Sequence, residues 1–126
     1  MSEHLDMSGR AATEAHALYN MGFYDGAIAR AYYAMYHAAR AALLHLDPKF
    51  ALAKTHKGLL QQFSRLFILT GGGNADLSRS KRRALNARIE IDYEARPATR
   101  EAAMELVAAM DEFQDAIKKF IGNKGP

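Results

Sequence analysis

The chain has 126 residues, a formal net charge of +3 and no cysteine. A chain of this length builds one domain, because two cores of ordinary size need more residues. The absence of cysteine excludes disulfides, thiolate metal sites and a cysteine nucleophile, and it agrees with a reducing compartment. The sequence contains no apolar run of about 20 residues, the length that crosses a bilayer, and no secretory signal. We therefore expect a single cytoplasmic domain over residues 1–126, without a membrane span.

The first half of the chain predicts two helices, because its apolar residues recur with the helical period. The first helix is expected over about 8–21, with a turn at Gly22, and the second over 25–46, with Asp25 as its N-cap and Pro48 beyond its end. The residues expected to face inward are Ala11, Ala15, Leu18 and Tyr19 in the first helix, and Ile28, Tyr32, Met35, Ala39, Ala42 and Leu46 in the second.

The second half predicts three more helices. One is expected over 55–69, a more polar one over 75–93, and a last one over 99–121, after a break at Pro97 and with Gly122 as its terminator. No segment shows the strict alternation of a half-buried strand. The inward residues of the last helix are expected to be Ala103, Leu106, Met110, Phe113, Ile117 and Phe120.

Four long helices and a fifth that is shorter or more polar indicate an all-α protein, an antiparallel up-and-down four-helix bundle. The second helix is rich in alanine, which lets neighbouring helices approach closely. Residues 17–28 also look like the start of a tetratricopeptide repeat. That architecture stays a minor alternative, because such a solenoid needs several stacked repeats and no second copy follows.

An arginine and a histidine lie seven positions apart in the second helix. Seven steps of about 100° return almost to the starting direction, so Arg30 and His37 share one stripe, with roughly 10 Å of axial rise between them. An imidazole that titrates near neutrality beside a permanent cation can move a proton and steady a phosphate. Tyr33, on the same helix, keeps a hydroxyl for a polar partner. The alternative is a partly buried helix whose polar tips reach solvent.

Basic residues cluster in the polar helix, between Arg79 and Arg88, and make a candidate phosphate-facing patch that includes Arg82. The alternative is a solvated helix face, and a net charge of +3 is too small to establish nucleic-acid binding. Arg88 and Asp92 are one turn apart and can pair, which either fastens the helix or orients the guanidinium towards a phosphate.

A second histidine, His56, begins the third predicted helix and can join His37 if the second and third helices are neighbours. The two imidazoles would then supply an acid and a base for transphosphorylation, although surface solvation of His56 is an equal alternative. The other histidines show no spacing typical of metal ligands. We expect no metal and no cofactor.

Three stretches of the sequence resemble the HEPN domain family, named for its occurrence in higher eukaryotes and prokaryotes and its link to nucleotide binding. Residues 29–44, ARAYYAMYHAARAALL, are similar to the signature helix of the family. Residues 55–59, THKGL, are similar to the start of its third helix, and residues 88–94, RIEIDYE, to its element of Arg, three residues and Asp-Tyr. With the C-terminal helix, the resemblance covers nearly the whole chain.

The resemblance implies a small helical bundle that pairs as a homodimer and is often encoded beside a minimal nucleotidyltransferase, as a toxin with its antitoxin. Many family members are metal-independent ribonucleases that use an Arg followed after four to six residues by a His, from both subunits. Arg30 and His37 have this spacing, on the earlier helix, and are the candidate catalytic residues. Arg88 is followed five positions later by Tyr93, where the family pattern has a histidine.

The function predicted from the sequence is therefore nucleotide or RNA binding, with metal-independent RNA cleavage as the candidate activity. A non-enzymatic dimeric helical adaptor or a nucleotide-binding partner subunit is the alternative, and Tyr93 in place of histidine favours it. The residues expected to bind nucleotide or RNA are Tyr33, His56, Arg82, Arg88, Asp92 and Tyr93.

Overall fold

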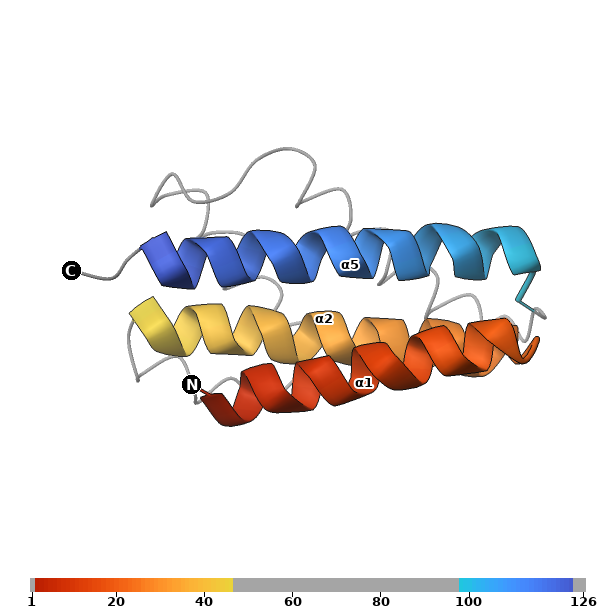
Figure 1. Ribbon diagram of the computed structural model, residues 1–126, viewed down its shortest axis with the longest axis horizontal. Helices are drawn as coiled ribbons and strands as arrows, with labels where there is room; N and C mark the ends of the chain where they lie inside the picture. The colour runs from red at the N-terminus through yellow and green to blue at the C-terminus, as the bar shows by residue number, and fades with distance from the viewer. Residues whose placement is uncertain (1, 47–97, 124–126) are drawn as a thin grey trace.

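The computed structural model describes residues 2–46 and 98–123, and these form three helices (Figure 1). They are α1 (Ser2–Asn20), α2 (Tyr24–Leu46) and α5 (Arg100–Asn123). The helices lie side by side, and α2 packs against both others. α1 runs opposite to α2, whereas α2 and α5 run in the same direction. Every described element is helical, which confirms the all-α prediction.

The helices predicted over 55–69 and 75–93 lie outside the described residues. The four-helix bundle that includes them therefore stays a prediction. The helices predicted around 8–21, 25–46 and 99–121 are all present, with different ends.

A tight turn between α1 and α2 fixes their antiparallel arrangement. Gly22 has φ of 82°, the left-handed conformation that glycine adopts without steric cost. Its N–H donates to the carbonyl of Tyr19 at 3.0 Å, and the N–H of Phe23 donates to the carbonyl of Leu18 at 2.9 Å. These two bonds are the Schellman pattern, which satisfies carbonyls left open at a helix end. The predicted turn at Gly22 is confirmed.

Asp25 does not cap α2, contrary to the sequence prediction. The helix already begins at Tyr24, and the Asp25 carboxylate instead accepts a hydrogen bond of 2.8 Å from the backbone N–H of Ala98. This contact ties the entry of α5 to the α1–α2 turn. α5 has its own N-cap, because Thr99 Oγ1 accepts a hydrogen bond of 3.0 Å from the N–H of Ala102.

Two helix ends also differ from the prediction. α1 begins at Ser2 instead of Ser8, because the early turns have partners of their own: Leu5 packs against the core. α5 continues through Gly122 to Asn123, so this glycine does not terminate it. Glycine lowers helix stability without excluding helix, and Ile121, packed against the core beside it, favours continuation.

The core is centred on α2, which is buried along two adjacent rows. Its small side chains bring neighbouring helices close, and α5 fills the remaining space with larger ones. All described side chains that were predicted to face inward are buried or partly buried. Alanines with exposures of 1% or less line α2 at Ala27, Ala31, Ala34, Ala38, Ala39, Ala41 and Ala42; α5 contributes Ala103, Leu106, Met110, Phe113 and Ile117, also at 1% or less.

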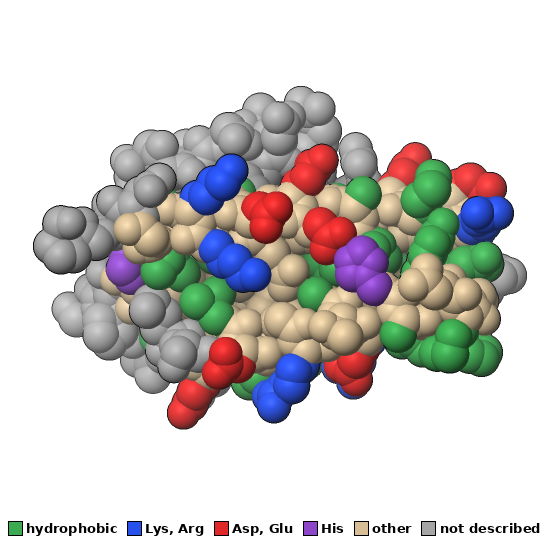
Figure 2. Space-filling view, viewed as in Figure 1, with side chains coloured by type: hydrophobic (Ala, Val, Ile, Leu, Met, Phe, Trp, Pro, Cys, Tyr) green, Lys and Arg blue, Asp and Glu red, His purple; other side chains and the backbone are tan. Residues whose placement is uncertain are grey.

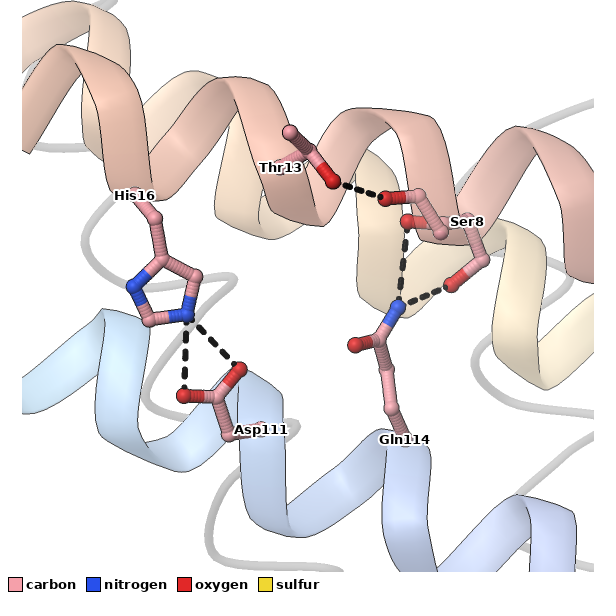
Figure 3. Close-up of polar contacts among 6 residues, drawn as sticks. Ser8, Thr13, His16, Asp111 and Gln114 are labelled. Carbon is pink, nitrogen blue, oxygen red and sulfur yellow. Dashed lines mark hydrogen bonds and ion pairs between the residues drawn. The ribbon is translucent and has the colours of Figure 1, made fainter.

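One buried polar cluster links all three helices. Gln114 Nε2 donates to Ser8 Oγ at 2.7 Å and to the Ser8 carbonyl at 3.0 Å (Figure 3). Ser8 Oγ in turn donates to the carbonyl of Ala34 in α2 at 2.7 Å. Buried polar groups are costly unless they are hydrogen-bonded, so this cluster fixes one register of α1 against α2 and α5.

Gly22→Ala is expected to lower the free energy of unfolding by about 1–2 kcal/mol, because alanine is strained at positive φ. Gly9→Ala is the matched control. Gly9 lies inside α1, where an added Cβ would have no other atom within 4 Å, so this change should raise stability by about 0.5–1 kcal/mol. Urea unfolding of both variants measures the two effects. The two effects should have opposite signs; a Gly22→Ala variant as stable as the wild type would contradict the turn.

Candidate functional site

Three residues of α2 form a continuous array. The guanidinium carbon of Arg30 lies 5.1 Å from the centre of the Tyr33 ring, a cation–π distance. The Tyr33 ring meets the His37 ring edge-on, with 4.4 Å between centroids. Tyr33 thus connects the two residues that the helical period placed on one stripe, the cation at one end and the imidazole at the other.

Arg30 is the accessible end of this array. Its side chain is 42% exposed, and its Nε lies 3.8 Å from a carboxylate oxygen of Glu14, which is itself 54% exposed. An ion pair this long between exposed side chains contributes little stability. An incoming phosphate can therefore displace Glu14 at small cost and take a bidentate hydrogen bond from the guanidinium.

His37 is the buried end, with 6% of its surface exposed. Its ring stacks on His4 of α1, with centroids 5.2 Å apart and planes 17° apart, and meets Tyr36 edge-on at 5.0 Å. The Nδ1 atoms of His4 and His37 are 3.0 Å apart, a hydrogen-bond distance. One of these nitrogens must carry a proton and the other must accept it.

Burial lowers the pKa of His4, and the positive charge of Arg40 lowers the pKa of that imidazole further. Arg40 is held nearby, where it donates from its guanidinium to the Tyr36 hydroxyl at 2.9 Å. His4 is consequently neutral at physiological pH.

Sequence reasoning missed His4, because the first helix was expected to begin at Ser8. The signal was present in the spacing: His4 lies one turn before Ser8 and continues the inward row that includes Ala11 and Ala15. Extending this row by one turn would have placed the imidazole against α2.

A second histidine pair joins α1 to α5. His16 Nε2 lies 3.0 Å from both carboxylate oxygens of Asp111 (Figure 3). Both side chains are nearly half exposed, so the pair is screened by water and contributes little to stability. It belongs to the α1–α5 contact and has no link to the array on α2.

The outward side of α5 carries mostly acidic charge (Figure 2). Arg100, Lys118 and Lys119 are also exposed on this helix, so its net charge is only weakly negative and it offers phosphate little attraction. By contrast, residues 47–97 hold ten of the seventeen Lys and Arg residues of the chain. The exposed acidic residues of α5 are Glu101, Glu105, Glu112 and Asp115.

Of the residues that the sequence assigned to the site, the structure therefore brings together Arg30, Tyr33 and His37 and adds His4. The others lie outside the described residues. Within residues 2–46 and 98–123, no group of three or more His, Asp or Glu side chains is placed to bind a metal ion. None of the three described helices is long and apolar enough to cross a membrane. The assigned residues outside the described ranges are His56, Arg82, Arg88, Asp92 and Tyr93.

The described part of the chain is all-helical. Its central helix, α2, carries a cation, an aromatic ring and an imidazole in line. The family model of the HEPN domain matches residues 1–120 of the chain. The chain belongs to the HEPN domain family, which confirms the resemblance drawn from its motifs.

Two similar proteins come from Methanocaldococcus jannaschii. The one named "Putative toxin MJ0605" is 34% identical over 107 residues, which cover 83% of this chain and 76% of that protein. The one named "Putative toxin MJ0142" is 38% identical over 80 residues, which cover 62% of this chain and 51% of that protein. The chain thus aligns with about half of the second relative.

His4→Asn is expected to reduce the loss of stability on acidification. The pKa of folded His4 lies below its ordinary value of about 6.5, so the unfolded chain binds this proton more readily. The contribution of His4 is therefore intact above about pH 6.5 and is lost as the pH falls below that value. Thermal unfolding at about pH 7.5 and pH 5.5 should give a smaller drop in Tm for His4→Asn than for the wild type. His16→Asn is the control and should match the wild type; equal drops in all three proteins would contradict the buried pair.

Proposed function

We propose that this protein is the toxin of a toxin–antitoxin pair and that it cleaves RNA without a metal ion. Membership of the HEPN family and the names of the two archaeal relatives support the first part. The observation that carries the second part is the array of Arg30, Tyr33 and His37 on one side of α2. It combines a permanent cation with an imidazole, a group that can accept and donate a proton.

The chemistry follows from these groups. His37 accepts the proton of an RNA 2′-hydroxyl as the 2′-oxygen attacks the adjacent phosphorus. Arg30 stabilises the charge that develops on the phosphate oxygens. The bond between phosphorus and the 5′-oxygen breaks, and an acid returns a proton to that oxygen; His56 is the candidate acid from the sequence. The products are a 2′,3′-cyclic phosphate and a 5′-hydroxyl, and no metal is needed because RNA supplies the nucleophile.

A homodimer is part of the proposal. His37 is 6% exposed, so RNA reaches the array first at Arg30, and a partner copy would complete the binding site around it. The antitoxin is proposed to be a minimal nucleotidyltransferase, as the family resemblance implies. Most alanines of α2 are buried within one copy, but Tyr33 and Tyr36 are only partly buried, and they support an interface because tyrosine is enriched where proteins meet.

We also propose the up-and-down four-helix bundle for the whole chain. α2 ends at the end of the molecule opposite to the start of α5 (Figure 1), and an up-and-down bundle needs a further helix that runs back between these two ends. The helix predicted over 55–69 is long enough for much of this return, at about 1.5 Å per residue. The polar helix predicted over 75–93 would then be the additional element that carries the basic patch.

A non-enzymatic role is the second candidate function. The burial of His37 and the presence of Tyr93 where the family pattern has a histidine favour it. In that case the protein is a dimeric adaptor or a nucleotide-binding subunit, and Arg30 recognises a phosphate without cleaving RNA.

Arg30→Ala and His37→Ala are each expected to reduce RNA cleavage by about 10²–10⁴-fold, the usual contribution of a proton-transferring group or a charge stabiliser. The measurement is incubation of purified protein with a mixed RNA pool in chelator, followed by analysis of the product ends. Cleavage should leave 2′,3′-cyclic phosphates. Arg10→Ala is the control, because Arg10 is an exposed arginine of α1, and it should keep full activity. Undiminished activity in the two site variants would remove them from the mechanism.

Arg82→Ala is expected to weaken RNA binding at every sequence tested. Loss of one phosphate contact lowers the salt dependence of the logarithm of the affinity by about 0.7 for single-stranded RNA. Titration of a labelled 2′-O-methyl RNA at several salt concentrations measures this slope. Lys118→Ala removes the same charge from the acidic helix α5 and should leave the slope unchanged; an equal effect of both variants would contradict a localised patch.

A further inference from the structure

Resting on the proposed function, we infer that His4 is a positioning residue for His37: it accepts the Nδ1 proton of His37, fixes its tautomer and raises its proton affinity. The two residues are 33 positions apart and come from different helices. No spacing motif on α2 contains His4. The inference thus adds an α1 residue to a site that the sequence placed on α2 alone.

The geometry limits how protons are arranged. With the two Nδ1 atoms 3.0 Å apart, both cannot carry a proton, because two N–H groups would then point at one another with no acceptor between them. When His37 takes up a proton it carries one on each ring nitrogen. Its Nδ1–H must then donate, and His4 Nδ1 must be the acceptor. A base already held in this tautomer needs no ring reorientation as it reacts.

The surroundings keep His4 in the accepting form. Burial and the Arg40 guanidinium lower its pKa, and the nearby carboxylate of Glu3 offsets this only in part. A neutral imidazole acceptor behind His37 has the role that a carboxylate has behind the histidine of a catalytic triad, which is to orient the ring and stabilise its protonated form. Tyr33 and Tyr36 meet the His37 ring edge-on and restrict its rotation.

The position of His4 is fixed by its own helix. Ser8, one turn further along α1, is hydrogen-bonded to the carbonyl of Ala34 and to Gln114. These buried bonds hold α1 in register on α2, and the His4 ring stacks on His37 with planes 17° apart. The contact is therefore supported by neighbouring buried bonds.

The test is an NMR measurement of histidine tautomers, which needs no RNA. Long-range proton–nitrogen spectra of the full-length protein, assigned with single-histidine substitutions, should show His37 protonated at Nδ1 in the neutral state. His4→Phe keeps a stacking ring and removes the acceptor, so His37 should lose this tautomer and its pKa should fall by about one unit. His4→Asn offers an oxygen near the position of Nδ1 and should restore the tautomer.

His16→Asn, on the same helix, should leave the His37 signals unchanged. A His37 protonated at Nε2 in the wild type, or identical His37 signals in wild type and His4→Phe, would overturn the inference. In RNA cleavage, His4→Phe should lower kcat at least about tenfold with KM unchanged and shift the acidic limb of the pH profile, whereas His4→Asn retains activity. No RNA cleavage beside the expected spectra would overturn the proposed function and leave the His4–His37 pairing intact.

Discussion

The close packing of α2 against two neighbours is the constraint on which the described structure depends. Its alanines have no side-chain bulk beyond Cβ, so α1 and α5 both approach it and exclude water. A larger residue in place of one of these alanines would separate the helices, because packed cores tolerate extra volume poorly. The same burial removes solvent from His37, a polar side chain of α2 that is 6% exposed.

The register of α1 on α2 then determines what meets His37. The turn at Gly22 makes residues at similar distances on either side of it neighbours, and the contacts follow this rule approximately along the hairpin. Leu18 lies against Gly26, where an added Cβ would be 3.2 Å from its Cδ1, Glu14 faces Arg30, and His4 reaches His37 at the far end. The conformation of Gly22 thus helps to determine which residue of α1 meets His37, about four helical turns away.

Much of this could be predicted from the sequence, because apolar periodicity reports directly on burial. Ala15, Ile28 and Phe113 were all assigned inward from spacing and are fully or almost fully buried. The family could also be recognised, since each of its motifs is a short stretch of local sequence, such as residues 29–44. The ends of the helices and the partners of polar side chains were harder to predict. The carboxylate of Asp25 bonds to a residue 73 positions away, and spacing along one helix carries no information about such a partner.

The contact of His4 with His37 was missed for the same reason. His4 contacts His37 across the hairpin, so it could be found only by combining the inward row of α1 with the register of the turn. The described surfaces also differ in charge. Arg30, Tyr33 and His37 form an array that His4 contacts, whereas acidic residues outnumber basic ones on the exposed side of α5.

The most direct test of RNA binding at Arg30, Tyr33 and His37 is a chemical-shift titration of the protein with a 2′-O-methyl RNA. This RNA binds without being cleaved because its nucleophile is blocked. The account predicts progressive shifts at Arg30, Tyr33 and His37, transmitted to His4, with the outer face of α5 unaffected. Shifts confined to the α5 face, or no shifts at Arg30 and His37 at saturation, would contradict it.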